Sequence, residues 1–295
     1  MRAKNHKWIA IGIIAIPAAL ILFFALAAAL FWGDLKNISL KRLAVIRMEG
    51  VITDSDWHVK TLREYRHNKN IAGVLLRIDS PGGAVAPSQE IYNEIAAYKA
   101  VQKPVVVSMG NMAASGGYYI ASPADKIFAS QGTITGSIGV IFTLPLYQEL
   151  AKKVGVEFRV FKAGAFKDMG SPYRSMSDNE AKVLQNLLDN THEQFINDVA
   201  AGRGVEAEVI RKAADGRIFT GKQAYEHGLV DTIGGYAQAI DYLRMICGVP
   251  ESVKPVEKRQ QSGWRELLLE SASKNFRGAL GTISRPAGLY FLYEP

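Results

Sequence analysis

Residues 111–119 read Asn-Met-Ala-Ala-Ser-Gly-Gly-Tyr-Tyr and place a serine, Ser115, between small residues on both sides. The valine-rich segment 104–109 before this run predicts a buried strand, and the segment 116–122 after it predicts a short helix. At such a corner a serine hydroxyl is uncrowded, and the positive helix end faces a reacting carbonyl oxygen. The run therefore predicts a nucleophilic serine on a strand–turn–helix unit, without the Gly-x-Ser-x-Gly pattern of the α/β-hydrolases.

A nucleophilic serine needs a base, and the histidines of this chain are poor candidates for that role. None lies in a glycine-rich or strand-terminal stretch, and a surface or structural role suits each of them better: His6, His58, His67, His192 and His227. Lysine is the other side chain that serves a serine as base.

Lys167 stands out among the lysines, because it follows the β-rich run 156–161 and has small and apolar neighbours. Such neighbours remove water from an amine and favour its neutral form. An ion pair with the adjacent Asp168 would oppose this, so we expect Asp168 to point elsewhere. The alternative for any single lysine is an ordinary solvated surface charge.

A Ser-Pro-Gly-Gly turn at 80–83 closes the predicted strand 71–78 and precedes the predicted helix 87–100. Glycine has no Cβ and tolerates positive φ, so the N–H groups of this turn can approach a ligand closely. Together with the Gly116 N–H they would complete an oxyanion hole for acyl transfer. A phosphate-binding turn and a plain strand–helix connection have the same pattern, and both stay open at this point.

Five short motifs occur in an order that resembles the signal peptide peptidase family of serine proteases. They are Ser-Pro-Gly-Gly (80–83), Ser-Met-Gly-Asn-Met-Ala-Ala-Ser-Gly-Gly-Tyr-Tyr (108–119), Ala-Asp-Lys-Ile-Phe-Ala (124–129), Thr-Gly-Ser-Ile-Gly-Val (135–140) and Phe-Lys-Asp-Met-Gly-Ser-Pro (166–172). The resemblance covers about residues 43–246. With one copy of the serine and lysine motifs, the chain is similar to the short, single-repeat form of the family.

The resemblance implies a serine endopeptidase with Ser115 as nucleophile and Lys167 as general base. It places the oxyanion hole on the backbone N–H groups of Gly83 and Gly116. It also gives Ser137 a supporting role near the lysine, for which an ordinary turn serine is an equal alternative.

The resemblance also implies a fold, an assembly and a class of substrate. The fold is α/β, a crotonase- or Clp-protease-like superhelix of repeated β-β-α units. The assembly is a homo-oligomeric ring, in which the serine and the lysine come from neighbouring protomers. The substrates are cleaved signal peptides and similar apolar peptides, and neither a cofactor nor a metal is expected.

Composition limits the remaining classes of function. The chain of 295 residues has one cysteine, which excludes an intramolecular disulfide and a cysteine-based metal cluster. Its formal net charge is +7, but the Lys and Arg residues are scattered without an aromatic-interleaved basic stripe. We therefore expect no nucleic-acid partner and prefer a basic flank near anionic lipid.

The stretch 8–32 carries no charged residue and predicts a transmembrane anchor. Trp8 and Trp32 stand where interface aromatics belong, and the basic residues of 1–7 favour an inside N-terminus. We expect a single-pass anchor in the cytoplasmic membrane with the catalytic domain outside. A cleaved signal peptide is the alternative, because Ala-x-Ala patterns occur at 25–29.

These features predict a basic N-terminus at 1–7, the anchor at 8–32, a linker at 33–41, a protease domain at 42–248 and a C-terminal part at 249–295. Short β-rich runs separated by helices predict an α/β protease domain, with strands at 42–52, 71–78, 104–109, 126–130 and 156–161. Capping boxes at Ser177 and Thr220 predict helices at 177–201 and 220–228.

The C-terminal part contains a polar linker at 250–263 and, from Trp264, apolar residues at the spacing of an amphipathic helix. The tail 287–293 is strongly apolar and chemically like the substrates of such a protease. We expect it to dock in an active-site groove or a subunit interface. A frayed tail, or one that packs on its own domain, is the alternative.

Two other functions fit part of the sequence. A crotonase-type acyl-CoA enzyme would share the fold and the oxyanion hole, but it requires a carboxylate base near the hole and a basic surface for CoA. The other function is that of a catalytically silent membrane scaffold that forms rings, and it predicts no loss of function on Ser115→Ala.

Overall fold

The computed structural model describes residue 23 and residues 41–258 and 290–292, in a chain that separates into two compact units, Met1–Lys41 and Arg42–Pro295. The predicted anchor, apart from residue 23, and the predicted amphipathic helix lie outside the described residues. Among the residues that are described, no helix has the length and apolar character needed to cross a bilayer.

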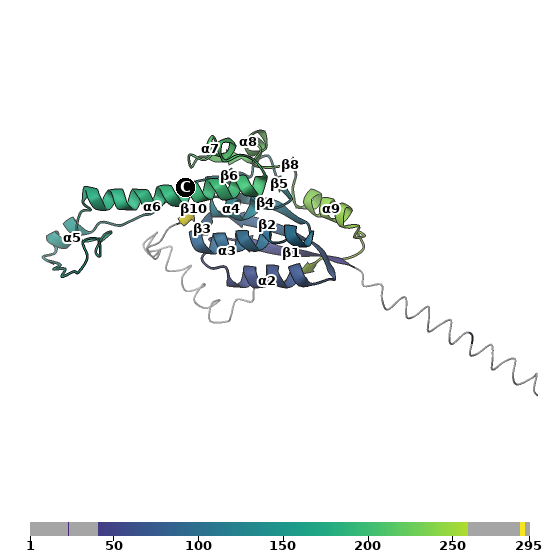
Figure 1. Ribbon diagram of the computed structural model, residues 1–295, viewed down its shortest axis with the longest axis horizontal. Coiled ribbons are helices and arrows are strands. Elements are labelled where there is room, and N and C mark those ends of the chain that lie inside the picture. The colour runs from purple at the N-terminus through teal and green to yellow at the C-terminus, as the bar shows by residue number, and fades with distance from the viewer. Residues whose placement is uncertain (1–22, 24–40, 259–289, 293–295) are drawn as a thin grey trace, which may run out of the picture. The chain divides into compact units, whose positions relative to one another are not determined.

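The second unit is built on an eight-stranded sheet (Figure 1). Six of its strands follow the order β7-β6-β4-β2-β1-β9, while β5 pairs with β4 and β8 pairs with β5. Its strands are β1 (Arg42–Glu49), β2 (Ile71–Ser80), β4 (Val105–Ala114), β5 (Lys126–Ala129), β6 (Ile134–Gly136), β7 (Ile218–Thr220), β8 (Thr232–Ile233) and β9 (Val256–Glu257). All pairs are parallel except β6 with β7. A separate two-stranded sheet joins β3 (Gly82–Ala84) to β10 (Tyr290–Leu292) in antiparallel fashion.

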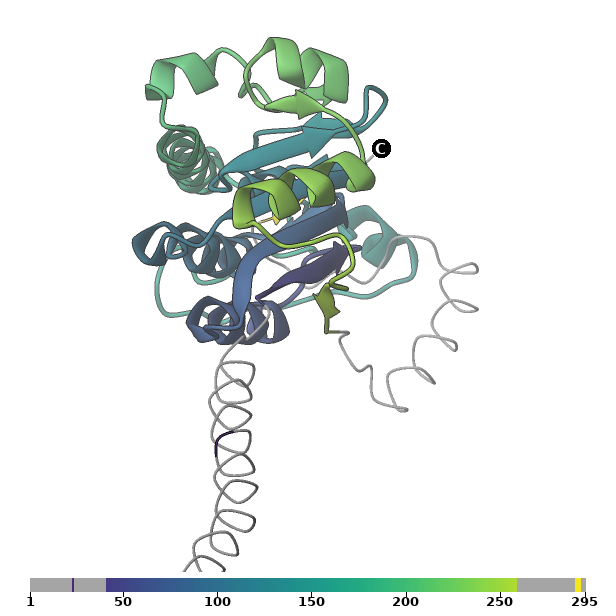
Figure 2. The ribbon, with the colours of Figure 1, turned by 90° about the vertical axis from the view of Figure 1, so that its right-hand side faces the viewer.

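Helices cover both faces of the large sheet (Figure 2). They are α2 (Asp56–His67), α3 (Val85–Ala96), α4 (Gly116–Ala121), α5 (Gln148–Lys153), α6 (Asp178–Arg203), α7 (Ala207–Arg211), α8 (Gly221–Glu226) and α9 (Tyr236–Cys247). On β1, Ala44 and Ile46 face the core shared with α2, α3, α4 and α6, whereas Leu43 and Val45 face α9. This alternation follows from the two-residue period of a strand, and burial on both faces explains the continuous apolar runs that the sequence shows.

The sequence predicted the strands β1, β2, β4 and β5 and the helices α3, α4, α6 and α8, but not the short strands β3 and β6 to β10. The α/β class is confirmed, with a mainly parallel sheet. Both capping boxes are present: Ser177 and Thr220 each accept a hydrogen bond from the N–H three residues on. The predicted strand 104–109 is longer than expected, because its continuation at Met112–Ala114 pairs with β6. The predicted helix 87–100 begins and ends earlier, as α3, and a 3₁₀ turn (Lys99–Val101) follows it.

The predicted strand at 156–161 is wrong. These residues have no regular secondary structure and are exposed. Alternating β-branched and aromatic residues favour a strand only where a partner strand exists, and none of the described strands pairs with this segment. It belongs to a region, residues 142–177, that we call the arm.

The arm lies at the end of α6 that is remote from the sheet, together with α5 (Figure 1). Helix α6 has 26 residues and is about 39 Å long at 1.5 Å per residue. Its second half packs into the core through Phe195, Ile196 and Val199, whereas Val183 and Leu187 in its first half are 41% and 46% exposed. The first half of α6 therefore holds the arm away from the sheet.

Candidate active site

Ser115 lies between β4 and α4, at the corner that the sequence predicted. Its backbone has φ 52° and ψ −117°, outside the regions that L-residues usually occupy. Two hydrogen bonds hold it there: its N–H donates to the Gly136 carbonyl at 2.8 Å, and its carbonyl accepts from the Tyr119 N–H at 2.8 Å. A strained serine at a strand–helix corner is the geometry of a nucleophile, because such strain persists where function requires it.

The Ser115 hydroxyl is buried, and its residue is 1% exposed. Within the part of the chain that the structure describes, Oγ has no hydrogen-bond partner. Burying an unpartnered hydroxyl costs free energy, and such groups in folded proteins are often reactive ones. The geometry suits a hydroxyl whose partner comes from a substrate or another chain.

The backbone N–H groups of Gly83 and Gly116 converge beside this serine. A Cβ built on Gly116 would lie 3.1 Å from the Gly83 nitrogen, and one built on Gly82 would lie 2.6 Å from the Gly116 nitrogen. On one side of β3, Ile52 bonds to the Gly82 carbonyl and the Ala84 N–H, at 2.8 and 2.7 Å. Since successive residues of a strand direct these groups to opposite sides, the Gly83 N–H faces away from Ile52. Two convergent donors of this kind can stabilise an oxyanion.

Ser137 is close to the same corner. It is 7% exposed, has φ 52°, and follows Gly136, whose carbonyl holds the Ser115 N–H. Its own N–H donates to the Arg217 carbonyl at 2.8 Å. The structure thus brings Ser115, Ser137 and the two predicted oxyanion glycines together.

Lys167 is the predicted site residue that a single chain does not bring to Ser115. It lies on the arm and is exposed, and among the described residues its ammonium makes no hydrogen bond or ion pair. Because the Ser115 Oγ has no hydrogen-bond partner either, the dyad is not formed within one chain as described.

Asp168 points away from Lys167, as predicted. It accepts hydrogen bonds from Lys162 and from Arg174, the latter at 2.8 Å. The Arg174 guanidinium also bonds Glu180, with Nη1 to Oε2 at 2.9 Å. Hydrogen bonds from Arg174, then Lys162, hold the pKa of Asp168 well below its usual range, and Arg174 lowers the pKa of Glu180 to about 2. Both carboxylates are thereby engaged by cations other than Lys167.

Three aromatic residues lie together beside the site. The sequence predicts that the tail 287–293 docks in an active-site groove or a subunit interface, with packing on its own domain as the alternative, and its residues 290–292 do pair with β3 of the same chain. The sequence did not predict the ring contacts that follow. Tyr119, Phe195 and Phe291 meet in one cluster, with ring centroids 4.4 to 5.1 Å apart. The pair Tyr118-Tyr119 directly after the serine was visible in the sequence, but the other two members come from α6 and β10. A cluster drawn from three distant segments has no local signal.

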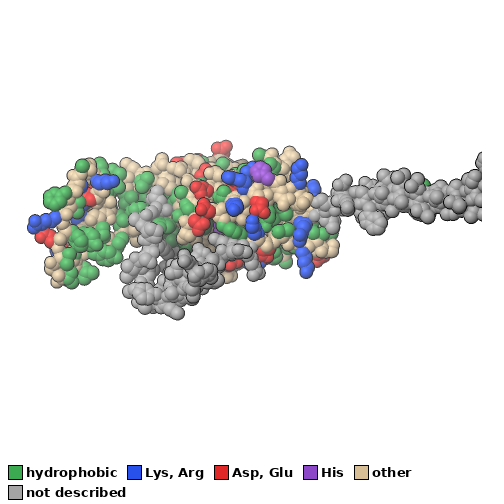
Figure 3. Space-filling model, turned by 90° about the horizontal axis from the view of Figure 1, so that it is seen from below, with side chains coloured by type: hydrophobic (Ala, Val, Ile, Leu, Met, Phe, Trp, Pro, Cys, Tyr) green, Lys and Arg blue, Asp and Glu red, His purple; other side chains and the backbone are tan. Residues whose placement is uncertain are grey.

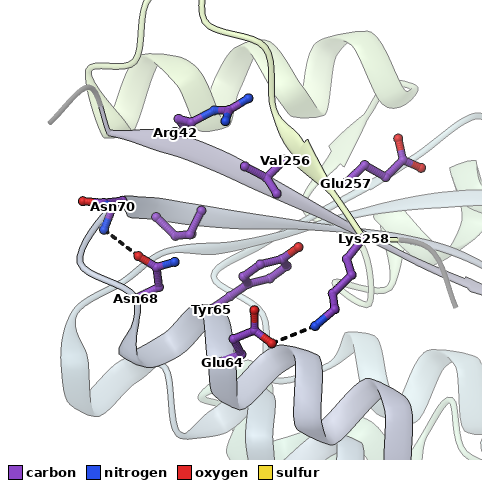
Figure 4. Close-up of a pocket in the computed structure, with 9 residues that line it drawn as sticks. Arg42, Glu64, Tyr65, Asn68, Asn70, Val256, Glu257 and Lys258 are labelled. Carbon is purple, nitrogen blue, oxygen red and sulfur yellow. Dashed lines mark hydrogen bonds and ion pairs between the residues drawn. The ribbon is translucent and has the colours of Figure 1, made fainter.

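The pocket in Figure 4 lies at the end of the sheet where β1 and β2 begin, and its volume is about 380 Å³. It is lined by residues at the start of β1 and β2 and by α2 and β9, and Lys258 pairs there with Glu64 at 2.7 Å. Ser115, in contrast, follows the C-terminal end of β4. No predicted site residue lines this pocket, and within residues 41–258 and 290–292 no three His, Cys, Asp or Glu side chains are grouped as metal ligands.

Gly82→Ala is expected to lower acyl-transfer activity by at least about 10²-fold, the usual cost of one oxyanion donor. Gly82 has φ +101°, and an added Cβ would meet the Gly116 nitrogen at 2.6 Å, so the turn carrying the Gly83 N–H must move. Gly132→Ala is the matched control, because nothing lies within 4 Å of its Cβ position. Both variants are compared by kcat/KM and by thermal unfolding, and equal activity in a folded Gly82→Ala protein would contradict the assignment.

Comparison with known proteins agrees with this geometry. Residues 97–249 match peptidase family S49, and residues 38–131 match the Clp protease family. A protein of Enterococcus faecium named as signal peptide peptidase SppA is 36% identical over 84% of this chain and 76% of its own length. A protein of Synechocystis named as a protease is 41% identical over 86% of this chain and 98% of its own length.

A third relative is the chloroplastic serine protease SPPA of Arabidopsis thaliana, which is 32% identical over 66% of this chain and 29% of its own length. The family match spans the serine corner and the lysine of the arm, and the first two relatives align over most of both chains. The chain belongs to peptidase family S49.

Proposed function

We propose that this protein is a membrane-anchored serine endopeptidase that cuts signal peptides and similar apolar peptides with a Ser115–Lys167 dyad. The observation that carries the proposal is the strained, buried Ser115 beside the convergent Gly83 and Gly116 amides. The substrate class follows from the relative named as a signal peptide peptidase and from the family match.

The mechanism follows from these positions. The neutral amine of Lys167 takes the proton of the Ser115 hydroxyl while Oγ attacks the peptide carbonyl carbon. The carbonyl oxygen becomes an oxyanion that the Gly83 and Gly116 N–H groups stabilise. Lys167 then donates the proton to the leaving amine, and a water activated by the same lysine hydrolyses the acyl-enzyme.

Assembly into a homo-oligomeric ring would deliver Lys167 to the Ser115 of a neighbouring protomer. The arm that carries Lys167 exposes many apolar side chains, visible at the left end of Figure 3. They include Leu146, Leu150, Val154, Phe158, Val160, Phe161 and Phe166, with Phe161 96% exposed. Exposed apolar surface of this extent is typical of an interaction site. A contact between the arm of one copy and the body of the next is heterologous, and such contacts form a ring where the rotation from copy to copy closes.

Our proposal also includes the repeat architecture of the fold and the location of the protein in the membrane. The match to the Clp protease family supports a superhelix of β-β-α units. The uncharged stretch 8–32 supports a single-pass anchor with the N-terminus inside and the catalytic domain outside the cytoplasmic membrane.

The function is tested with the purified full-length protein in detergent and a synthetic signal peptide, with products identified by mass spectrometry. We expect internal cleavage of the peptide and no turnover of acyl-CoA thioesters. Cleavage should rise with pH, since only a neutral lysine accepts the serine proton. Thioester turnover without peptide cleavage would replace the proposal with an acyl-CoA enzyme, and an assembled protein inactive on both would indicate a scaffold.

A further inference from the structure

The loop that carries Lys167 is joined to the first turn of α6 by the guanidinium group of Arg174. Its Nε donates to Asp168 Oδ2 at 2.8 Å, and its Nη2 donates to the Asp168 carbonyl at 3.1 Å. Towards the helix, Nη1 donates to Glu180 Oε2 at 2.9 Å and Nη2 donates to Glu180 Oε1 at 2.5 Å. Arg174 thus connects the residue directly after the proposed base to a residue of α6.

The two carboxylates that Arg174 joins are themselves held by further hydrogen bonds. The Glu180 side chain is 5% exposed and accepts from the Ser177 N–H at 2.9 Å, as one half of the capping box of α6. The Asp168 side chain is 13% exposed and also accepts from Lys162. A planar guanidinium that bonds two fixed carboxylates has one geometry available to it. The bridge therefore joins the loop and the helix end as one rigid piece.

The Lys167 loop has little else to define its position within its own chain. Residues 156–177 form neither helix nor strand, and residues 156–167 are exposed. Three successive turn hydrogen bonds shape the loop, from the N–H groups of Lys167, Met169 and Ser171 to carbonyls three residues back. Ordering exposed turns costs conformational entropy that packing does not offset here. The bridge through Arg174 supplies the tie that the turns alone lack.

The other half of α6 is fixed on the element that follows the nucleophile. Asp198 of α6 accepts the Tyr119 hydroxyl through its carboxylate, and its carbonyl accepts the Tyr92 hydroxyl at 2.7 Å. The Tyr119 N–H in turn donates to the Ser115 carbonyl at 2.8 Å. Helix α6 runs from this contact to the arm (Figure 1). In each chain, a continuous helix therefore links the serine corner to the bridge that holds the lysine loop.

We propose that Arg174 is a positioning residue for the general base, which fixes the Lys167 loop on α6 by bridging Asp168 to Glu180. Identical copies in a ring would then present Lys167 at one defined place beside the neighbouring Ser115. The inference rests on the proposed function and adds a residue that bonds neither Lys167 nor Ser115. Rates depend steeply on such placement, since a shift of about 1 Å in a reacting group can cost about 10²-fold.

Hydrolysis of a synthetic signal peptide by full-length Arg174→Gln protein tests the inference. We expect kcat to fall at least about tenfold because the base is misplaced, and KM to change little because Arg174 does not touch the Gly83 and Gly116 amides. Arg159→Gln is the matched control in the same arm. Arg159 is 3.7 Å from Glu157, and both side chains are more than three-quarters exposed. An unchanged kcat in Arg174→Gln, or an equal loss in both variants, would overturn the inference.

Mixing variants assigns the loss to delivery of the base rather than to general damage. An equal mixture of Arg174→Gln with Ser115→Ala pairs an intact serine with an intact arm at about a quarter of all sites, so about a quarter of the unsubstituted activity should return. A mixture with Lys167→Ala contains no intact arm and should stay at or below the activity of Arg174→Gln alone.

The mixture of Ser115→Ala with Lys167→Ala is the reference for these results, and native mass spectrometry establishes that mixed oligomers form. Where this reference recovers activity, recovery of Arg174→Gln by both partners or by neither would overturn the inference. Where it does not recover, the dyad lies in one chain, and the kcat of Arg174→Gln decides the inference.

Amide hydrogen exchange separates failure of the inference from failure of the proposed function, because it requires no catalysis. In Arg174→Gln, residues 164–171 should exchange at least about threefold faster, while residues 195–203 in the core half of α6 should not change. Faster exchange without cleavage by the unsubstituted protein would leave the bridge in place and remove the proposed activity. Cleavage with an unchanged kcat in Arg174→Gln would sink the positioning role while the protease stands.

Discussion

Ser115→Ala is expected to lower peptide hydrolysis by at least about 10⁴-fold, the scale on which serine proteases lose turnover without their nucleophile. The remaining rate would come from the oxyanion hole and substrate binding alone. The variant should be as stable as the unsubstituted protein or more so. Removing a buried hydroxyl that has no partner among the described residues removes a desolvation cost and breaks no hydrogen bond.

Ser122→Ala is a matched control for this variant. Ser122 is a buried serine at the end of α4, and its Oγ donates to the Tyr119 carbonyl at 2.8 Å. Loss of this hydrogen bond should lower the free energy of unfolding by about 1 kcal/mol, the usual net contribution of one hydrogen bond. Most of the hydrolytic activity should remain. The opposite pattern, with Ser115→Ala active and destabilised, would mean that Ser115 is structural and that the nucleophile is elsewhere.

Lys167→Ala is expected to abolish hydrolysis to a similar extent, and its mixture with Ser115→Ala should recover activity. If the dyad spans two protomers, a site is intact where a protomer with Ser115 meets a neighbour with Lys167. Random co-assembly of equal amounts makes such neighbours at about a quarter of all sites, so about a quarter of the unsubstituted activity should return. The structure motivates this result, because Lys167 lies on the exposed arm and Ser115 lies in the core of the same chain.

Two controls make the mixing experiment decisive. Native mass spectrometry establishes that mixed oligomers form, and Lys153→Ala, on the exposed end of α5 in the same arm, should keep its activity. Mixed oligomers without recovered hydrolysis would place both residues of the dyad in one chain. That outcome would require the arm to fold back towards the sheet.

The serine corner and the glycine turn were readable from the sequence, because their signals are local. A valine-rich strand, small residues around Ser115 and two glycines at 82–83 lie within short windows, and each constrains backbone conformation directly. The capping boxes at Ser177 and Thr220 were found for the same reason, since all their atoms lie within one helical turn.

Only the tertiary structure decided which of these pieces meet. It showed that residues 156–161 form no strand, since none of the described strands pairs with them, and that Lys167 remains apart from Ser115 in one chain as far as the structure describes it. It also brought Phe291 to Gly83 and enclosed its ring between Tyr119 and Phe195. Such contacts depend on packing between segments far apart in sequence, whereas local pattern reports only what neighbouring residues impose on one another.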